Sequence, residues 1–296
     1  CPGAKAADAR LFAAYKQQTV LAVMQQTRKT SDFLALYAFL RESGVTPLVV
    51  KGIVCRTLYP KPDNRPSGDE DLLIPAEEFP KCHQALLDYG MEVADPKADL
   101  DTAYEAPYRK PGSPLYIELH KSLFPADSEA YGDLNRFFAD ARPETLTVDG
   151  QEIATLPPTE HLLYLICHAL KHFLHSGFGI RQVSDLVLYA NRYGRNVNWQ
   201  RLLDCCREMH GEVFAAALFR IGQRYLTFDP EQAEYPAAWR AIPVDEGPLL
   251  EDLLASGVYG DATMSRKHSS NITLDAVAAE KQGTHAAGLR KTLFPT

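Results

Sequence analysis

The hydrophobic pattern of this chain changes at Pro157-Pro158. Before this pair, short apolar and β-branched runs such as residues 46–50 and 69–74 alternate with turns and helical segments, which predicts a sheet mixed with helices. After it, residues 159–226 show helical periodicity, short turns and no convincing strand. We therefore expect an α+β protein. Residues 1–156 would form the α/β domain, and residues 157–296 a mainly helical domain with an irregular C-terminal segment.

Turn residues divide the first half into elements. Apolar residues at helical spacing predict helices over residues 8–28, 31–43, 53–59 and 75–89. Ser31 or Asp32 is the expected N-cap of the second helix, and Gly44 and Gly90 follow two of the helix ends. Residues 60–68 are predicted to be a loop. Two hairpins are expected, one pairing residues 104–109 with 115–120 and one pairing 146–148 with 153–155.

Charge and cysteine content exclude several classes of function. The chain has 31 Lys+Arg against 38 Asp+Glu, a net charge of −7, which disfavours a long nucleic acid as partner. We expect no association with a membrane, because no apolar run reaches the roughly 20 residues that cross a bilayer. The six cysteines form no CxxC pair, so we expect neither a zinc ribbon nor a disulfide framework. We therefore expect a cytoplasmic location, where thiols stay reduced.

Three acids are candidates for a metal site. Asp69 and Asp71 start a predicted strand two residues apart, so both carboxylates face the same side, about 6.6 Å apart. Glu118 lies in the strand of residues 115–120, on the face opposite the apolar residues. A carboxylate in an apolar strand must be paired, exposed at an edge or bound to metal. Two solvated turn acids and an exposed hairpin edge remain the alternative interpretation.

Lys51-Gly52 lies where a predicted strand passes into a helix. Backbone N–H groups at a helix N-terminus bind phosphate, and glycine lets the backbone approach a ligand closely. Lys51 could contact phosphates itself, or could be only a solvated strand end. The loop that follows carries Arg65, Ser67 and Gly68 directly before the Asp69 pair.

The order of these elements resembles the DNA-polymerase-β-type nucleotidyltransferase superfamily, with its glycine turn, Asp-x-Asp pair and later strand acid. The segments "LVVKGIVCRTLYP", "RPSGDEDLLI", "YIELHKSLF", "LPPTEHLLYLICHALKH" and "IRQVSDLVLYA" resemble the bacterial uncharacterised nucleotidyltransferase family over about residues 34–226. The resemblance implies a nucleotidyltransferase fold, a mixed β-sheet with flanking helices, followed by a helical domain.

The resemblance also implies roles for the site residues. Asp69, Asp71 and Glu118 would be the catalytic metal-binding residues. The two aspartates would hold Mg²⁺, or Mn²⁺, against a nucleoside triphosphate, and Glu118 would complete a second metal site or act as base toward an acceptor hydroxyl. The nucleotide-binding residues would be Lys51, Gly52, Arg65, Ser67 and Gly68. His120 would orient a metal ligand or the acceptor; a histidine with ordinary hydrogen bonds fits the sequence equally well.

One departure from the superfamily leaves three functions open. The usual second Gly or Ser after the glycine is replaced by Ile53. The chain could transfer a nucleoside monophosphate to a hydroxyl of a small molecule or protein, or carry out another phosphoryl transfer. It could also be a nucleotide-binding or regulatory protein that has lost turnover. The resemblance implies that relatives continue beyond the closing "LFP" segment, so a further C-terminal piece beyond Thr296 is an expectation.

The histidines of the second half allow more than one interpretation. His168 and His172 are four residues apart on one predicted helix face and could bind zinc, line the active-site cleft or only pack. The HExxH glutamate is missing and no third ligand is evident. The resemblance favours a lining of the cleft, with Asp185 as a helix cap or as a partner for these histidines.

Overall fold

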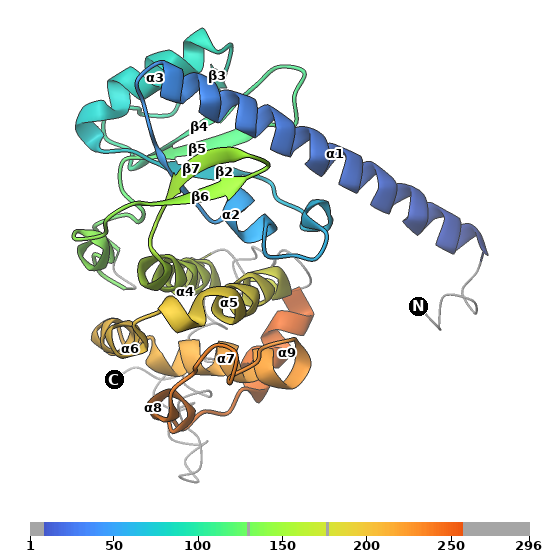
Figure 1. Ribbon diagram of the computed structural model, residues 1–296, viewed down its shortest axis with the longest axis vertical. Coiled ribbons are helices and arrows are strands. Elements are labelled where there is room, and N and C mark those ends of the chain that lie inside the picture. The colour runs from blue at the N-terminus through green and yellow to red at the C-terminus, as the bar shows by residue number, and fades with distance from the viewer. Residues whose placement is uncertain (1–8, 129–130, 176–177, 257–296) are drawn as a thin grey trace, which may run out of the picture. The chain divides into compact units, whose positions relative to one another are not determined.

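The structure is a computed structural model that describes residues 9–128, 131–175 and 178–256. Its chain forms two compact units, drawn in Figure 1. Unit 1 comprises Cys1–Leu123 and Pro143–Leu156, and unit 2 comprises Phe124–Arg142 and Pro157–Thr296. By its contacts, Phe124–Arg142 therefore belongs with the helices, although it precedes residue 156. Residues 257–296, part of the expected irregular C-terminal segment, lie outside the described residues.

A mixed sheet of seven strands, in the order β3-β4-β5-β2-β1-β7-β6, forms the centre of unit 1. The strands are β1 Leu48–Val50, β2 Glu70–Leu73, β3 Glu92–Val93, β4 Glu105–Arg109, β5 Tyr116–His120, β6 Glu144–Val148 and β7 Gln151–Thr155. The pairs β2–β5 and β1–β7 are parallel and the other pairs antiparallel. Both expected hairpins, β4–β5 and β6–β7, are present. The α+β class and the mixed sheet are confirmed, and among the strands of the described residues only the two-residue β3 was not predicted.

The helices of unit 1 are α1 Ala9–Glu42, α2 Gly52–Arg56 and α3 Phe79–Asp88. The prediction of two helices before Gly44 is wrong, because α1 runs unbroken through Ser31 and Asp32. Residues 28–32 contain neither Gly nor Pro, and the Asp32 carboxylate accepts a hydrogen bond from Ser113 instead of capping a helix. Gly44 and Gly90 do follow the ends of α1 and α3, with φ of 73° and 88°. Among the described residues, no helix combines the length and apolarity that a membrane span requires.

Strand alternation divides the sheet into two unlike faces. Leu72 of β2 lies opposite Leu119 of β5, and both are fully buried in the core. Glu70 lies on this same core face, opposite Ile117, and is itself fully buried. The alternate residues of β2 and β5 point to the other face because side chains change sides at every step. The acids predicted to bind metal lie on that second face.

Unit 2 is built from helices in its described residues. They are α4 Pro158–His175, α5 Ile180–Tyr193, α6 Trp199–Glu208, α7 Glu212–Tyr225, α8 Ala237–Arg240 and α9 Gly247–Ser256. The helical character predicted for residues 159–226 is confirmed, and α8 and α9 extend it into the next stretch. Short 3-10 turns complete the two units: Pro62–Asn64, Ala76–Glu78, Asn135–Phe138 and Gly194–Asn196. Buried aromatic rings, among them Trp199, Phe219 and Trp239, contact one another in the core of unit 2.

Candidate metal centre

Two parallel strands bring the first ligand atoms together. Asp71 of β2 is in register with Glu118 of β5, and His120 follows Glu118 by two residues on the same face. One carboxylate oxygen of each acid and one ring nitrogen of His120 all lie within 4.8 Å of one another, the only such group of three found among the described residues. Carboxylate oxygen and imidazole nitrogen are common metal ligands. The donor set fits a divalent cation.

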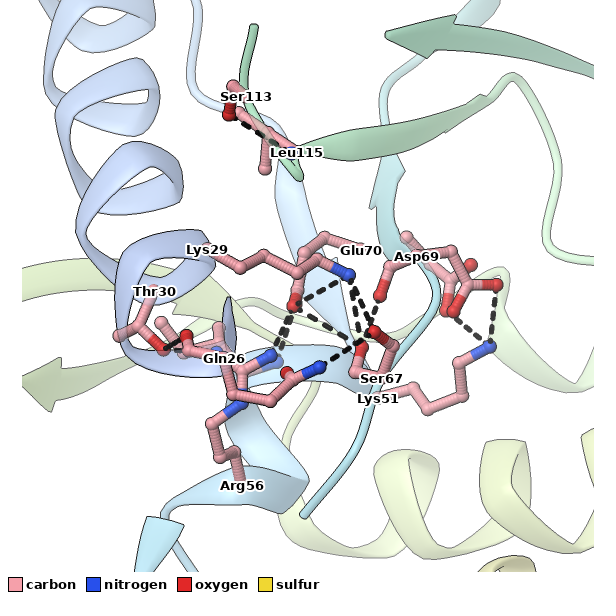
Figure 2. A network of polar contacts seen from close by, with 12 residues as sticks. Gln26, Lys29, Thr30, Lys51, Arg56, Ser67, Asp69, Glu70, Ser113 and Leu115 are labelled. Carbon is pink, nitrogen blue, oxygen red and sulfur yellow. Dashed lines mark hydrogen bonds and ion pairs between the residues drawn. The ribbon is translucent and has the colours of Figure 1, made fainter. Parts of the chain in front are cut away.

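Lys51, directly after β1, supplies a positive charge at the same place. Its Nζ lies 2.8 Å from Asp71 Oδ2 and 3.6 Å from Asp69 Oδ2. Figure 2 shows Lys51 pointing toward Asp69. Burial alone would lower the pKa of Lys51, but the charges of Asp69 and Asp71 raise it above its ordinary value. The lysine therefore stays protonated and balances the two aspartates in the metal-free protein.

Asp71 and Glu118 differ in protonation. Burial disfavours the charged form of Asp71, yet the Lys51 ammonium and His120 outweigh it and hold the pKa of Asp71 below its usual range. Burial, together with the nearby charges of Asp71 and Asp69, raises the pKa of Glu118 to about 8. Glu118 is thus largely protonated at neutral pH without metal, and a cation bound beside it would displace the proton.

Glu70, between the two aspartates, has a different environment that the sequence analysis missed. Its Oε1 accepts a hydrogen bond from Arg56 Nη2 at 2.6 Å and lies 3.7 Å from Lys29 Nζ. Its Oε2 accepts one from the backbone N–H of Ile53 at 2.6 Å. Figure 2 shows Lys29 and Arg56 converging on this carboxylate. Alternation with Leu72 was a signal that Glu70 belongs to the core face, where a carboxylate needs such partners.

The Lys51-Gly52 turn is shaped by Glu70. Lys51 and Gly52 have φ of 58° and 21°. A Cβ on Gly52 would lie 1.9 Å from Glu70 Oε2, so glycine is required here for the close approach of that carboxylate. The Ile53 N–H, at the start of α2, is bonded to the same oxygen. The close approach that the sequence suggested for a ligand is therefore made by the protein's own Glu70.

The loop before β2 is held by contacts within unit 1. Ser67 Oγ donates to the backbone oxygen of Asp69 at 2.6 Å, and Gln26 Nε2 donates to the backbone oxygen of Ser67 at 3.2 Å. Arg65 is fully buried, whereas Gly68 is exposed with no neighbouring atom where a Cβ would project. Ser67 thus bonds within the loop and to α1, and Gly68 leaves room directly beside Asp69; that Arg65, Ser67 and Gly68 bind a nucleotide remains a prediction.

A sequence comparison decides the family. The model of the uncharacterised nucleotidyltransferase family matches residues 3–227, about three quarters of the chain. The chain belongs to this family. It is therefore a nucleotidyltransferase, a transferase, as the resemblance of its motifs implied. No curated protein sequence matches it significantly.

Several solved structures are similar to this nucleotidyltransferase at low identity. The antibiotic-resistance factor ANT(2'')-Ia shares 14% identity with a TM-score of 0.43, over 64% of this chain and 95% of that one. An antigenic nucleotidyltransferase-like protein from Paracoccidioides brasiliensis shares 16% identity with a TM-score of 0.41, over 73% and 93%. JHP933 from Helicobacter pylori shares 15% identity with a TM-score of 0.38, over 89% and 97%. Similarities of this size say nothing about substrate.

The candidate cleft residues of the nucleotidyltransferase's helical half lie in unit 2. His168 and His172 of α4 face each other, with Nε2 atoms 3.1 Å apart, and His168 also contacts the Tyr164 ring. Asp185 of α5 is buried. Among the described residues, no third metal ligand joins the two histidines. That His168, His172 and Asp185 line the cleft of the metal centre remains a prediction.

Proposed function

We propose that this nucleotidyltransferase uses Mg²⁺ or Mn²⁺ to move a nucleoside monophosphate from a nucleoside triphosphate to a hydroxyl of a small molecule or protein. The observation that carries the proposal is the row of Asp71 and Glu118 on one sheet face, with Asp69 beside them. Divalent cations between such carboxylates would stabilise charge on the triphosphate during transfer.

Five cysteines among the described residues are free thiols, which favours a cytoplasmic location.

The three acids take distinct parts in this reaction. Asp69 and Asp71 would hold the cation that orients the triphosphate. Glu118 would complete a second cation position or, in its charged form, accept the proton of the attacking hydroxyl. The hydroxyl oxygen forms a bond to the α-phosphorus, the bond from that phosphorus to the bridging oxygen breaks, and pyrophosphate leaves.

Lys51 would exchange one anionic partner for another. In the metal-free protein its ammonium neutralises Asp69 and Asp71. A divalent cation at these carboxylates would neutralise them in place of the Lys51 ammonium. The flexible Lys51 side chain could then pair with oxygens of the triphosphate. Gly68 would let the triphosphate pass close to the loop, while Gly52, Arg65 and Ser67 would support the site by shaping the backbone around it.

One observation favours an alternative in which the fold binds nucleotide without turnover. The Ile53 N–H at the turn is already bonded to Glu70, so this backbone donor is not available to a phosphate. Such a regulatory protein would bind a triphosphate and metal but release no pyrophosphate. A phosphotransferase using the same site would release a nucleoside diphosphate. The reaction products therefore distinguish all three functions.

The decisive experiment incubates the protein with each of the four nucleoside triphosphates and Mg²⁺ or Mn²⁺, alone and with pools of hydroxyl-bearing metabolites. The proposal predicts metal-dependent pyrophosphate release with one or more triphosphates, and its loss in Asp71→Asn. Incorporation of α-³²P label into the protein would identify a protein acceptor. Triphosphate binding without pyrophosphate, across all acceptors tried, would favour the regulatory alternative.

A further inference from the structure

We propose that His120 is itself a ligand of the centre through Nε2, that Glu105 orients it through Nδ1, and that this nitrogen ligand makes the site prefer Mn²⁺ or another transition metal to Mg²⁺. The inference rests on the proposed function, in which Asp71 and Glu118 hold metal. It adds a ligand and a metal preference that three carboxylates alone would not provide.

The buried ring of His120 makes no hydrogen bond to a described residue through either of its nitrogens. The residue is only 4% exposed, and neither ring nitrogen has a hydrogen-bond partner among the described residues. Nε2 points between two acids, 3.6 Å from Asp71 Oδ1 and 3.9 Å from Glu118 Oε2. Buried polar atoms are nearly always satisfied, so an unsatisfied imidazole facing two carboxylates indicates a missing partner.

The distances suit a cation in that position. Bonds of about 2.1 Å from a metal to nitrogen and oxygen place neighbouring ligand atoms about 3.0–3.5 Å apart. The two distances to Nε2 exceed this by at most a few tenths of an ångström, and all three ligand atoms lie within 4.8 Å of one another, so a bound cation would draw them together. The same separations are too long for direct hydrogen bonds from Nε2 to either carboxylate.

Glu105 provides the support that metal-bound histidines usually have. It is the cross-strand partner of His120 in the β4–β5 pair, and its Oε2 lies 3.4 Å from Nδ1. Nδ1 makes no hydrogen bond with the described residues of the metal-free protein, but with a cation at Nε2 a small movement would let Glu105 accept the Nδ1 proton, which would keep Nε2 unprotonated toward the cation. Glu105, His120, Glu118 and Asp71 thus lie on one face of three adjacent strands, β4, β5 and β2, with Glu105 opposite His120 and Glu118 opposite Asp71.

Asp71 lies between two positions that a cation can occupy. Its Oδ2 is paired with Lys51, whereas its Oδ1 faces His120. The carboxylate therefore borders two separate cation positions, one occupied by the Lys51 ammonium and one lined by His120 and Glu118. Mg²⁺ prefers oxygen ligands in near-octahedral geometry, whereas imidazole suits transition metals. The His120 position is accordingly the one expected to discriminate between metals.

Direct metal binding to the nucleotide-free full chain tests this proposal. Mn²⁺ and Mg²⁺ affinities would be measured by electron paramagnetic resonance of free Mn²⁺, with Mg²⁺ as competitor, in wild type, His120→Gln and Glu105→Gln. We expect wild type to prefer Mn²⁺, His120→Gln to weaken Mn²⁺ binding at least tenfold with a much smaller effect on Mg²⁺, and Glu105→Gln to weaken Mn²⁺ several-fold. His210→Asn, at an exposed residue of unit 2 with φ of 55°, is the matched control and should change neither affinity.

A spectroscopic arm uses unaltered protein, so the test holds even where a variant folds poorly. Zn²⁺ added to ¹⁵N-histidine-labelled wild type should shift the His120 ring resonances, and Co²⁺ added to wild type should give an absorption band typical of nitrogen ligation. Equal Mn²⁺ affinity in wild type and folded His120→Gln, or no shift of the His120 resonances, would overturn the proposal. Pyrophosphate release that persists in that case would leave the proposed function standing. Metal binding through His120 without any nucleotide turnover would support the His120 ligand and contradict the proposed function.

Discussion

Glu70 and Asp71 are neighbours on one strand, yet their surroundings are opposite. Glu70 lies on the core face, fully buried, with Arg56, Lys29 and the Ile53 N–H around its two oxygens. Asp71 lies on the other face, where the nearby groups include another acid and a histidine without hydrogen bonds. The comparison teaches that strand alternation sorts a run of acids: the structural acid is surrounded by donors on the core face, whereas Asp71 shares one ammonium with Asp69 and borders a second acid and an unbonded histidine.

The cations of the two regions differ in the same way. Arg56 approaches Glu70 at 2.6 Å, and its 1% exposure leaves it no solvent to turn toward. Lys51 ends in a single ammonium on a flexible stem and is shared by two aspartates. A guanidinium fixed in the core suits a permanent pair, whereas an ammonium at the site can be displaced by a metal ion.

The largest expected effect comes from breaking the structural pair. Glu70→Gln would remove the charge that balances buried Arg56 and Lys29, and an uncompensated buried charge costs about 3–5 kcal/mol. The free energy of unfolding of the metal-free protein, from urea denaturation, should fall by that amount. Glu92→Gln is the control, because its pair with Arg109 is exposed and should contribute less than about 1 kcal/mol. Similar losses in both variants would contradict the assignment of Glu70.

Asp71→Asn should have a small effect on the stability of the metal-free protein and a large effect on its stabilisation by metal and nucleotide. Loss of the Lys51 pair lowers the stability of the metal-free protein, but a neutral Asn avoids the penalty for burying a charged carboxylate, which offsets part of this loss, so we expect a decrease of no more than about 1–2 kcal/mol. Stabilisation by Mn²⁺ or Mg²⁺ plus nucleoside triphosphate should nearly vanish. Melting temperatures with and without these ligands give both quantities. Ligand-induced stabilisation as large as that of wild type would refute a metal-binding role for Asp71.

This contrast marks what the sequence could predict. Alternation and turn residues were enough for the hairpins and for the face of Glu118, because they are local signals. The register that sets Asp71 beside Glu118 joins strands far apart in the chain, and no local pattern encodes it. Glu70 was missed because its partners Lys29 and Arg56 come from two different helices. The continuity of α1 through Ser31 was missed because cap residues also occur inside helices when contacts with the rest of the fold hold them there.

Replacing Lys51 tests whether the cation of the site is displaceable. Lys51→Met keeps most of the unbranched side chain and removes the ammonium that competes for Asp69 and Asp71. We expect Mn²⁺ binding without nucleotide to become several-fold tighter and triphosphate binding several-fold weaker, both measured by isothermal titration calorimetry. Lys81→Met, at a lysine that contacts only the backbone oxygen of Gly44 among the hydrogen bonds seen, is the control. Weaker metal binding in Lys51→Met would show that the ammonium supports the metal site instead of competing with it.

The smallest expected effect concerns the proton on Glu118. Its pKa is raised from an ordinary value near 4.5 to about 8 in the metal-free fold. Between those pH values the folded protein binds a proton that the unfolded chain has released, so this group's contribution is complete below pH 4.5 and is lost as pH rises through 8. The melting temperature of wild type in a chelator should therefore fall more steeply from pH 5 to 8 than that of Glu118→Gln, which cannot titrate. Because the side chain is 31% exposed, solvent weakens the effect, and we expect a difference of only about a few degrees. With saturating Mn²⁺, the melting temperature of wild type should instead rise relative to that of Glu118→Gln as the pH increases, since the cation requires the charged carboxylate that high pH favours. Parallel pH profiles for the two proteins would mean that Glu118 titrates in its ordinary range, as an acid with solvent around it does.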